Sequence, residues 1–239
     1  MKLLLHPVEP NKILMAWQQP GQDNHGASVS KQGKRFLVAE IYKEEDSYAL
    51  KYLTQHPDYN AAVNAGFKGH PAFKLGKEKH TTNILEIFIK RLPDRRRSDY
   101  LDFLKYYRIS PDSKISDFAL LGYTGGELPS DGFSFIHTLE SDHLPQEFII
   151  TLAGTRHYLE NLKSISVNDS VVFSREPENT HDEHAVHISI NGKILGYVKK
   201  GQAETFSRWL QKFKIVGSVE RINGSPTNPN VLIYGAVIA

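Results

Sequence analysis

The stretch from Arg175 to Lys200, REPENTHDEHAVHISINGKILGYVKK, restricts the fold more than any other part of this 239-residue chain. Its first part, Glu176 to Asp182, gathers Pro, Asn, Thr and Asp between apolar runs, which is the composition of a turn. From Ala185 to Ile190, apolar and polar residues largely alternate, as in a half-buried strand. The pair Asn191-Gly192 predicts a tight turn into a second strand that runs from Lys193 to Val198. We therefore expect a polar loop followed by a β-hairpin.

This stretch and the segment LAGTRHY, from Leu152 to Tyr158, together resemble the HIRAN domain, a small module associated with binding single-stranded DNA ends. The resemblance covers the chain from residue 144 to 239. It implies a small OB-like β-barrel with one or two helices. It also implies a set of DNA-binding candidates, namely Arg156, His157, Tyr158, Asn179, His181, Asp182, Lys199 and Lys200.

The roles implied by the resemblance agree with what a terminal nucleotide requires, which is cations for phosphates and flat side chains for base stacking. Arg156 matches a phosphate-binding arginine, and Lys199 and Lys200 match a basic pair. A carboxylate such as Asp182 accepts a hydrogen bond from a free 3′-OH and repels the phosphodiester of an internal position. The alternative is that Arg156 and Asp182 pair with each other and only fix the loop.

The sequence also departs from the family. His157 and His181 occupy stacking positions that are often Tyr in the family, and the segment INGSPTNPN lacks an expected aromatic residue.

The first half of the chain carries a second resemblance, to the N-terminal subdomain of HipA-type kinases, over most of residues 12 to 136. It rests on the segments ILMAWQQP, KRFLVAEI, YALKYL, AGFKGHPAF, NILEIFIKRLPDRRRSDYLDFL and FALLGYTGGELPSDGFSFI. The resemblance implies a non-catalytic domain that docks a protein partner, with a separately encoded HipA-type kinase as a candidate. No phosphate-binding loop with a catalytic Asp follows residue 144, so we expect no kinase activity.

The patterns predict an α+β protein in which the N-terminal domain is a mixed sheet with packed helices. The expected strands are Lys12–Trp17, Arg35–Tyr42 and Tyr48–Leu53, with GQDNHGASVSKQGK as the connection between the first two. The expected helices are Asn60–Gly66, Thr82–Leu92 with Thr81 or Thr82 as N-cap, and Ser98–Tyr107. YTGGELP is expected to form a hairpin turn. The polar segment HTLESDHLPQEF predicts a boundary between domains at 1–143 and 144–239.

Composition excludes several classes of protein. The chain has no Cys and therefore no disulfide or thiolate chemistry, which fits a cytoplasmic location. No apolar run is long enough to span a membrane. A net charge of +2 is too small to attract nucleic acid by itself, so binding would depend on local cations. The basic groups at Arg95–Arg97 and Lys199–Lys214 are most simply interpreted as solvated surfaces.

No arrangement of residues indicates catalysis or a cofactor. His181, His184 and His187 would alternate faces on a strand, which argues against a metal site. We therefore expect a non-enzymatic protein that binds single-stranded DNA, with 3′ ends as a candidate target and no cofactor or metal. The setting would be bacterial or phage-related, in toxin–antitoxin control, DNA repair or defence. The alternatives are an antitoxin-like module that inhibits a kinase, and a nuclease with an unrecognised metal cluster.

Overall fold

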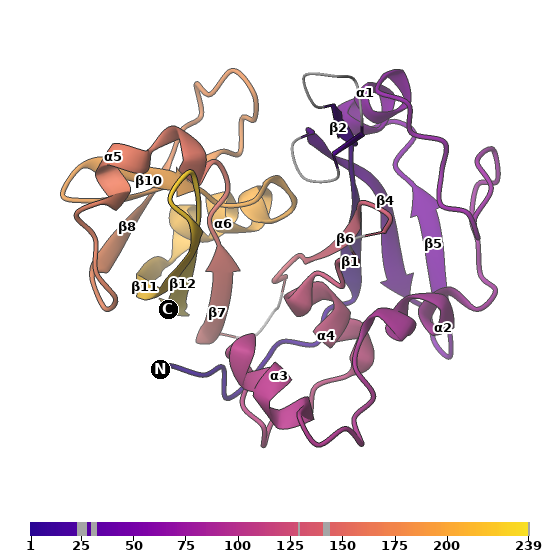
Figure 1. Ribbon diagram of the computed structural model, residues 1–239, viewed down its shortest axis with the longest axis horizontal. Coiled ribbons are helices and arrows are strands. Elements are labelled where there is room, and N and C mark those ends of the chain that lie inside the picture. The colour runs from indigo at the N-terminus through magenta and orange to yellow at the C-terminus, as the bar shows by residue number, and fades with distance from the viewer. Residues whose placement is uncertain (23–27, 30–32, 129, 141–143, 239) are drawn as a thin grey trace. The chain divides into compact units, whose positions relative to one another are not determined.

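A computed structural model describes the chain except residues 23–27, 30–32, 129, 141–143 and 239 (Figure 1). The chain divides into two compact units, which are described separately. The N-terminal unit comprises Glu9–Tyr100 and Ile115–Thr138, and the C-terminal unit comprises Met1–Val8, Leu101–Lys114 and Leu139–Ala239. The boundary expected near residue 144 stays a prediction. The structure adds that two segments from before this boundary belong to the C-terminal unit.

The N-terminal unit contains a four-stranded sheet with the order β5-β4-β1-β6. Its strands are β1 (Lys12–Gln18), β4 (Arg35–Lys43), β5 (Tyr48–Tyr52) and β6 (Phe133–His137). The first three confirm the expected strands. All described pairings in this sheet are antiparallel, so the expectation of a mixed sheet is wrong. The reason is that β6 returns from the helices to pair antiparallel with β1. The expected connection after β1 lies partly outside the described residues and includes β2 (Gly21–Gln22) and β3 (Ser28–Val29).

Three short helices accompany this sheet: α1 (Pro57–Asn64), α2 (Ile84–Phe88), which continues into the 3-10 helix η1 (Ile89–Arg91), and α4 (Asp117–Thr124). Helix α1 contacts β4, and α4 contacts β6 and β1. Fully buried aromatic and aliphatic side chains, including Ile13, Met15, Phe88 and Phe118, form the core. Among the described residues, no helix is both long enough and apolar enough to cross a membrane.

Three details of these helices differ from expectation. Helix α1 begins three residues earlier than predicted, at Pro57, and ends at Asn64. Helix α2 begins two residues later than predicted, because Asn83 adopts a left-handed conformation before it, without a side-chain cap.

Helix α4 was not predicted. Its last residues are Tyr123 and Thr124, so the hairpin turn expected at YTGGELP is wrong, and Pro129 of that segment lies outside the described residues. The Ser116 hydroxyl caps α4 by accepting the amide N–H of Ala119 at 3.0 Å, and Gly125 ends it with a φ of 80°.

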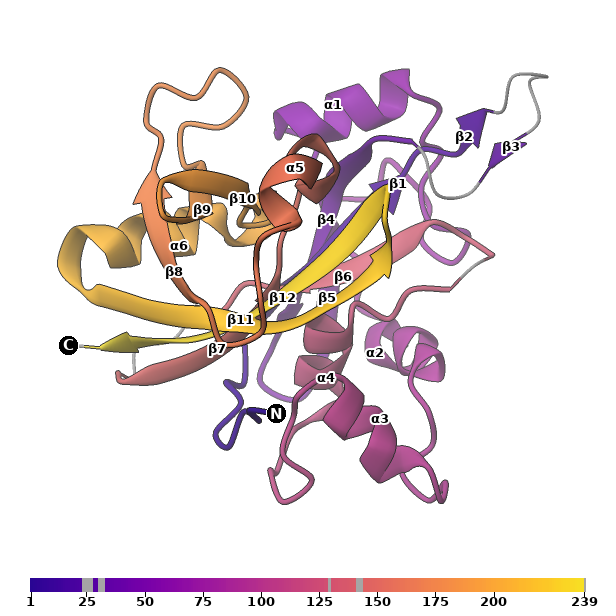
Figure 2. The same ribbon diagram turned by 60° about the vertical axis from the view of Figure 1, so that its left-hand side comes forward.

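The C-terminal unit contains a six-stranded antiparallel sheet with the order β10-β9-β8-β11-β12-β7. Its strands are β7 (Gln146–Thr151), β8 (Ser170–Arg175), β9 (Val186–Ile190), β10 (Lys193–Tyr197), β11 (Lys214–Ser225) and β12 (Asn228–Ile238). The sheet is curled (Figure 2), and it forms a half-barrel where a small barrel was expected. The predicted hairpin is confirmed, because Asn191 and Gly192 have φ values of 49° and 77°, as a tight two-residue turn requires.

The helices of this unit are α3 (Tyr100–Tyr106), which belongs to it from Leu101 onward, the 3-10 helix η2 (Thr155–His157), α5 (Leu159–Leu162) and α6 (Lys200–Lys212). Helix α6 packs on β8, β9 and β11. Its Phe206 is fully buried, and the centre of its ring lies 4.9 Å from the ring centre of Phe148 and 5.0 Å from that of Trp209. This aromatic core holds the helix against the curled sheet.

A buried ion pair fastens the 101–114 segment to β11. Arg108 Nε lies 2.9 Å from Glu220 Oε1, and the Glu220 side chain is only 2% exposed. The same carboxylate oxygen accepts the backbone N–H of Lys2 at 3.0 Å. Arg221 adds a second link, because its Nη1 donates to the carbonyl oxygen of Tyr106 at 2.8 Å. Residues that precede position 144 in the chain therefore bind to this sheet.

We expect Arg108→Ala to lower the free energy of unfolding by about 3–5 kcal/mol, because it leaves the buried Glu220 carboxylate without its countercharge. Urea unfolding of the full chain measures this change. Lys163→Ala is the control, since its ion pair with Glu160 is exposed and should be worth less than about 1 kcal/mol. Equal stability of the two variants would contradict this role of Arg108.

Candidate nucleic-acid interface

The segment that follows β7 meets β10 at one antiparallel bridge, between Ala153 and Tyr197. The N–H of Ala153 donates to the Tyr197 carbonyl at 2.8 Å, and the N–H of Tyr197 donates back at 2.9 Å. Gly196 permits this approach, because a Cβ atom there would lie 2.7 Å from the Ala153 oxygen. This bridge brings the LAGTRHY segment beside the end of β10, from which Lys199 and Lys200 follow.

Helix η2 presents the first group of candidate residues. Gly154 precedes this helix and has a φ of 72°. The hydroxyl of the buried Thr155 donates to the Pro229 carbonyl at 2.6 Å. Arg156 and His157 are exposed, and Arg156 Nε donates to His157 Nε2 at 3.3 Å. Within the described part of the chain, Arg156 has no carboxylate partner. Its guanidinium is therefore available to a phosphate.

The loop of residues 176–185, between β8 and β9, presents the second group and extends away from the sheet in both ribbon views (Figures 1 and 2). Asn179 Oδ1 accepts the backbone N–H groups of His181 at 3.0 Å and Asp182 at 3.2 Å. Asp182 Oδ1 accepts the N–H of His184 at 2.9 Å. The Asn179 side chain therefore stabilises the conformation of the loop itself. The second Asp182 oxygen has no partner among the described residues and remains an acceptor.

Glu176, at the start of this loop, accepts hydrogen bonds from three side chains. Its Oε2 accepts Asn179 Nδ2 at 2.9 Å, and its Oε1 accepts His187 Nδ1 at 2.9 Å. The Tyr197 hydroxyl lies 3.2 and 3.1 Å from the two oxygens. Burial by itself raises the pKa of Glu176, but the hydrogen bonds from Asn179, Tyr197 and His187 outweigh burial and hold the pKa below its ordinary value.

Tyr197 connects the Glu176 carboxylate with the end of η2. The hydroxyl oxygens of Tyr197 and Tyr158, 39 positions apart in the chain, lie 3.5 Å from each other. Burial, followed by the hydrogen bonds to Tyr158 and Glu176, raises the pKa of Tyr197, so this hydroxyl remains protonated at neutral pH. The structure therefore links η2, the 176–185 loop and the start of α6 through one tyrosine.

The eight candidate residues lie on these three linked segments, and their DNA-binding roles stay predictions. Among the described residues, Arg156 and Asp182 form no ion pair, so the structure does not support the alternative in which they pair with each other. His184 lies in the loop before β9, so the strand argument for alternating histidines does not apply to it. Across the described positions, no group of three or more His, Asp or Glu side chains is arranged to hold a metal ion.

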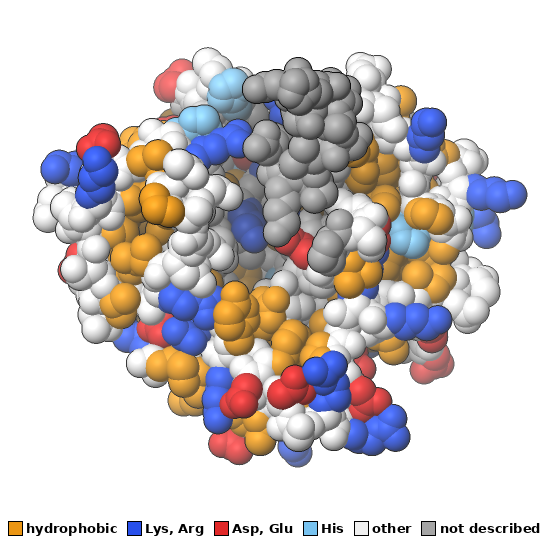
Figure 3. All heavy atoms as spheres, in the orientation of Figure 1, with side chains coloured by type: hydrophobic (Ala, Val, Ile, Leu, Met, Phe, Trp, Pro, Cys, Tyr) orange, Lys and Arg blue, Asp and Glu red, His pale blue; other side chains and the backbone are white. Residues whose placement is uncertain are grey.

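The other basic cluster, Arg95–Arg97, is neutralised by neighbouring aspartates. Arg95, Arg96 and Arg97 each pair with an aspartate, at distances of 2.5, 2.6 and 2.7 Å, and these partners are Asp117, Asp94 and Asp99. Acidic and basic side chains alternate along the lower edge of the face in Figure 3, around the segment that leads into α3. This agrees with the interpretation as a solvated turn.

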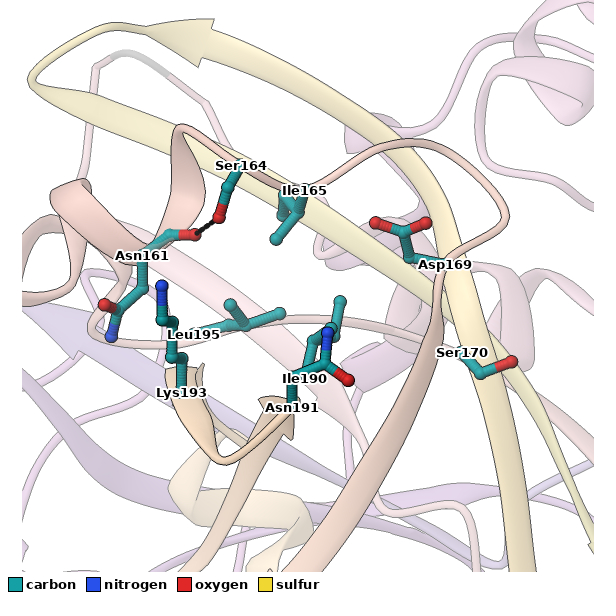
Figure 4. Close-up of a pocket in the computed structure, with 9 residues that line it drawn as sticks. All are labelled: Asn161, Ser164, Ile165, Asp169, Ser170, Ile190, Asn191, Lys193 and Leu195. Atoms are coloured by element: carbon teal, nitrogen blue, oxygen red, sulfur yellow. Dashed lines mark hydrogen bonds between the residues drawn. The ribbon is translucent and has the colours of Figure 1, made fainter.

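A cavity of about 350 Å³ lies at the opposite end of the β9–β10 hairpin from Tyr197 (Figure 4). It has an apolar floor with polar groups around it, and its lining residues are Asn161, Ser164, Ile165, Asp169, Ser170, Ile190, Asn191, Lys193 and Leu195. None of the eight candidate residues lines this cavity. It is therefore separate from the candidate interface.

Sequence reasoning missed Glu176, His187 and Tyr197 as parts of the site. A signal was present for two of them. Glu176 begins the polar loop, and Tyr197 is an aromatic residue two positions before the basic pair. The His187–Glu176 contact joins β9 to the residue that follows β8, and only the strand pairing shows that they are neighbours.

Comparison with known proteins finds similarity over part of the chain. Residues 145–234 match the HIRAN domain family. The crystal structure of the HIRAN domain of human HLTF is 21% identical over 38% of this chain and 74% of that chain, with a TM-score of 0.32. A protein from Lactobacillus plantarum is 18% identical over 39% of this chain and 98% of that chain, with a TM-score of 0.33. No curated protein matches the chain.

The family match supports the expected HIRAN domain at residues 145–234. The HipA-type resemblance of residues 12 to 136 is not supported by any of these comparisons and stays an expectation.

Proposed function

We propose that this chain binds single-stranded DNA through its HIRAN domain and that the candidate interface contacts a 3′ end. HIRAN domains are DNA-binding modules, and the match over residues 145–234 is the basis of the general function. One observation carries the specific proposal, namely the convergence of η2, the 176–185 loop and the start of α6 on Tyr197. This arrangement brings together the Arg156 guanidinium, the flat rings of His157 and His181, and the Asp182 oxygen that has no partner among the described residues.

Each of these groups has a distinct chemical role in the proposed complex. The Arg156 guanidinium donates to phosphate oxygens, for which its planar donors are well suited. His181 and His157 are exposed and offer flat rings to unstacked bases. The free oxygen of Asp182 accepts a hydrogen bond from a terminal 3′-OH. A 3′-phosphate would instead meet a like charge, so the loop selects free ends.

We expect Arg156→Ala to weaken binding to a single-stranded oligonucleotide roughly tenfold, because one charge-assisted hydrogen bond to phosphate is lost. The slope of the logarithm of affinity against the logarithm of salt concentration should flatten by about 0.7. Fluorescence anisotropy over a salt series measures both quantities. Lys193→Ala is the matched control, because Lys193 is an exposed cation at the far end of β10 and should leave both unchanged. An unchanged slope in the Arg156 variant would show that Arg156 does not contact a phosphate.

We expect Asp182→Asn to abolish the preference for a 3′-OH over a 3′-phosphate while retaining most of the affinity for single strands. The amide keeps an acceptor oxygen for the His184 N–H but removes the negative charge that repels a phosphate. Paired oligonucleotides that differ only at the 3′ end test this expectation. Glu183→Gln removes the same charge from the exposed neighbouring position and should retain the preference. Loss of the preference in both variants would point to general charge instead of Asp182.

The proposed activity is binding without catalysis, and a protein partner for the N-terminal unit belongs to the same proposal. The sequence contains no phosphate-binding loop or nucleophile motif to suggest an enzyme. Inhibition of a HipA-type kinase remains the alternative. It rests only on the sequence resemblance of residues 12 to 136.

A further inference from the structure

We infer that Glu176 is the positioning residue of the candidate interface. Its carboxylate fixes the rest of the 176–185 loop and connects that loop to the bridge at Tyr197. The consequence for DNA binding rests on the proposed function. The role in holding the loop does not, because it concerns the free protein.

The contacts of Glu176 reach three separate elements. Asn179 lies in the loop, His187 on β9 and Tyr197 on β10, and all three donate to the one carboxylate. Backbone bonds add to this arrangement, since the N–H of Glu176 donates to the Ala185 carbonyl at 2.8 Å and thereby joins the two ends of the loop. Hydrogen bonds to an ionised acceptor are stronger than those between neutral groups. Glu176 therefore determines where Asn179, and with it the loop backbone up to Asp182, lies.

A carboxylate at this place is unfavourable for binding DNA in electrostatic terms alone, because it repels phosphates. Glu178, two positions later, offers a direct comparison. Glu178 is exposed and has no side-chain partner in the described regions, whereas Glu176 is partly buried and both its oxygens are occupied. The two residues carry the same charge and lie in the same loop. They differ because, in the described regions, only the Glu176 carboxylate is hydrogen-bonded to other side chains.

The substitution Glu176→Gln separates a positioning role from an electrostatic one by the sign of its effect. Glutamine keeps one acceptor oxygen, but its NH₂ group cannot accept the hydrogen bonds that the second carboxylate oxygen receives. If Glu176 positions the loop, affinity for single strands should fall, by about tenfold if the ordered loop is reduced to a tenth of the molecules. If Glu176 only contributes charge, affinity should stay the same or rise, as expected for Glu178→Gln.

The experiment measures two quantities on the full chain, for the parent and for both variants. Hydrogen exchange in the free protein should become roughly tenfold faster or more at residues 177–185 in Glu176→Gln and remain unchanged in Glu178→Gln. Affinity for a single-stranded oligonucleotide with a free 3′-OH should fall only in Glu176→Gln. Exchange in β11 and β12 should match the parent, which establishes that the variant is folded.

Unchanged loop exchange in Glu176→Gln would overturn the inference. Faster loop exchange without any loss of affinity would overturn the connection to DNA binding. If the parent itself binds no single-stranded DNA, the proposed function fails. The exchange data then still decide whether Glu176 holds the loop.

Discussion

The bridge between Ala153 and Tyr197 is the constraint on which the candidate interface depends. A six-stranded sheet with this strand order leaves β10 and β7 as edges, and edges expose unpaired backbone groups. Curling lets the segment after β7 meet β10, and two hydrogen bonds pair the N–H and C=O groups of Ala153 and Tyr197. Because η2 follows that segment and α6 follows β10, one pair of backbone bonds brings together residues from distant parts of the chain. The absence of a side chain at Gly196 makes the close approach possible.

Hydrogen bonds between polar side chains form a second level of organisation in the candidate interface. Glu176, Tyr197, Tyr158 and Asn179 form a network in which almost every group has a defined donor or acceptor role. Such networks fix geometry because a partly buried polar group without its partner is costly. The side chains free to bind a ligand, such as Arg156 and the second oxygen of Asp182, lie at the outside of this network. The interface thus divides into residues that hold the loop and residues that remain available.

Local patterns predicted local structure well. The alternation before Asn191-Gly192 and the turn preference of that pair predicted the β9–β10 hairpin, because both properties depend on neighbours in the sequence. The expected mixed sheet was wrong, because β6 pairs with β1 across more than a hundred positions of the chain and the sequence does not state the direction of that pairing. The hairpin expected at YTGGELP was wrong although the signals for α4 are local, namely the Ser116 cap at its start and Gly125 at its end. The eight candidate residues came from a family resemblance. The contact between His187 and Glu176 could not be predicted, because it depends on the pairing of β8 with β9, which the sequence does not state.

The central claim is that three separated segments form one binding surface for a DNA end, and mapping amide resonances by NMR tests it most directly. A short single-stranded oligonucleotide with a free 3′-OH would be titrated into the isotope-labelled full chain. The account predicts that amides of Arg156 to Tyr158, the 179–184 segment and residues 199–201 shift together and saturate at one affinity. Shifts confined to the cavity beside Asn161 and Asp169, or to the N-terminal unit, would contradict it.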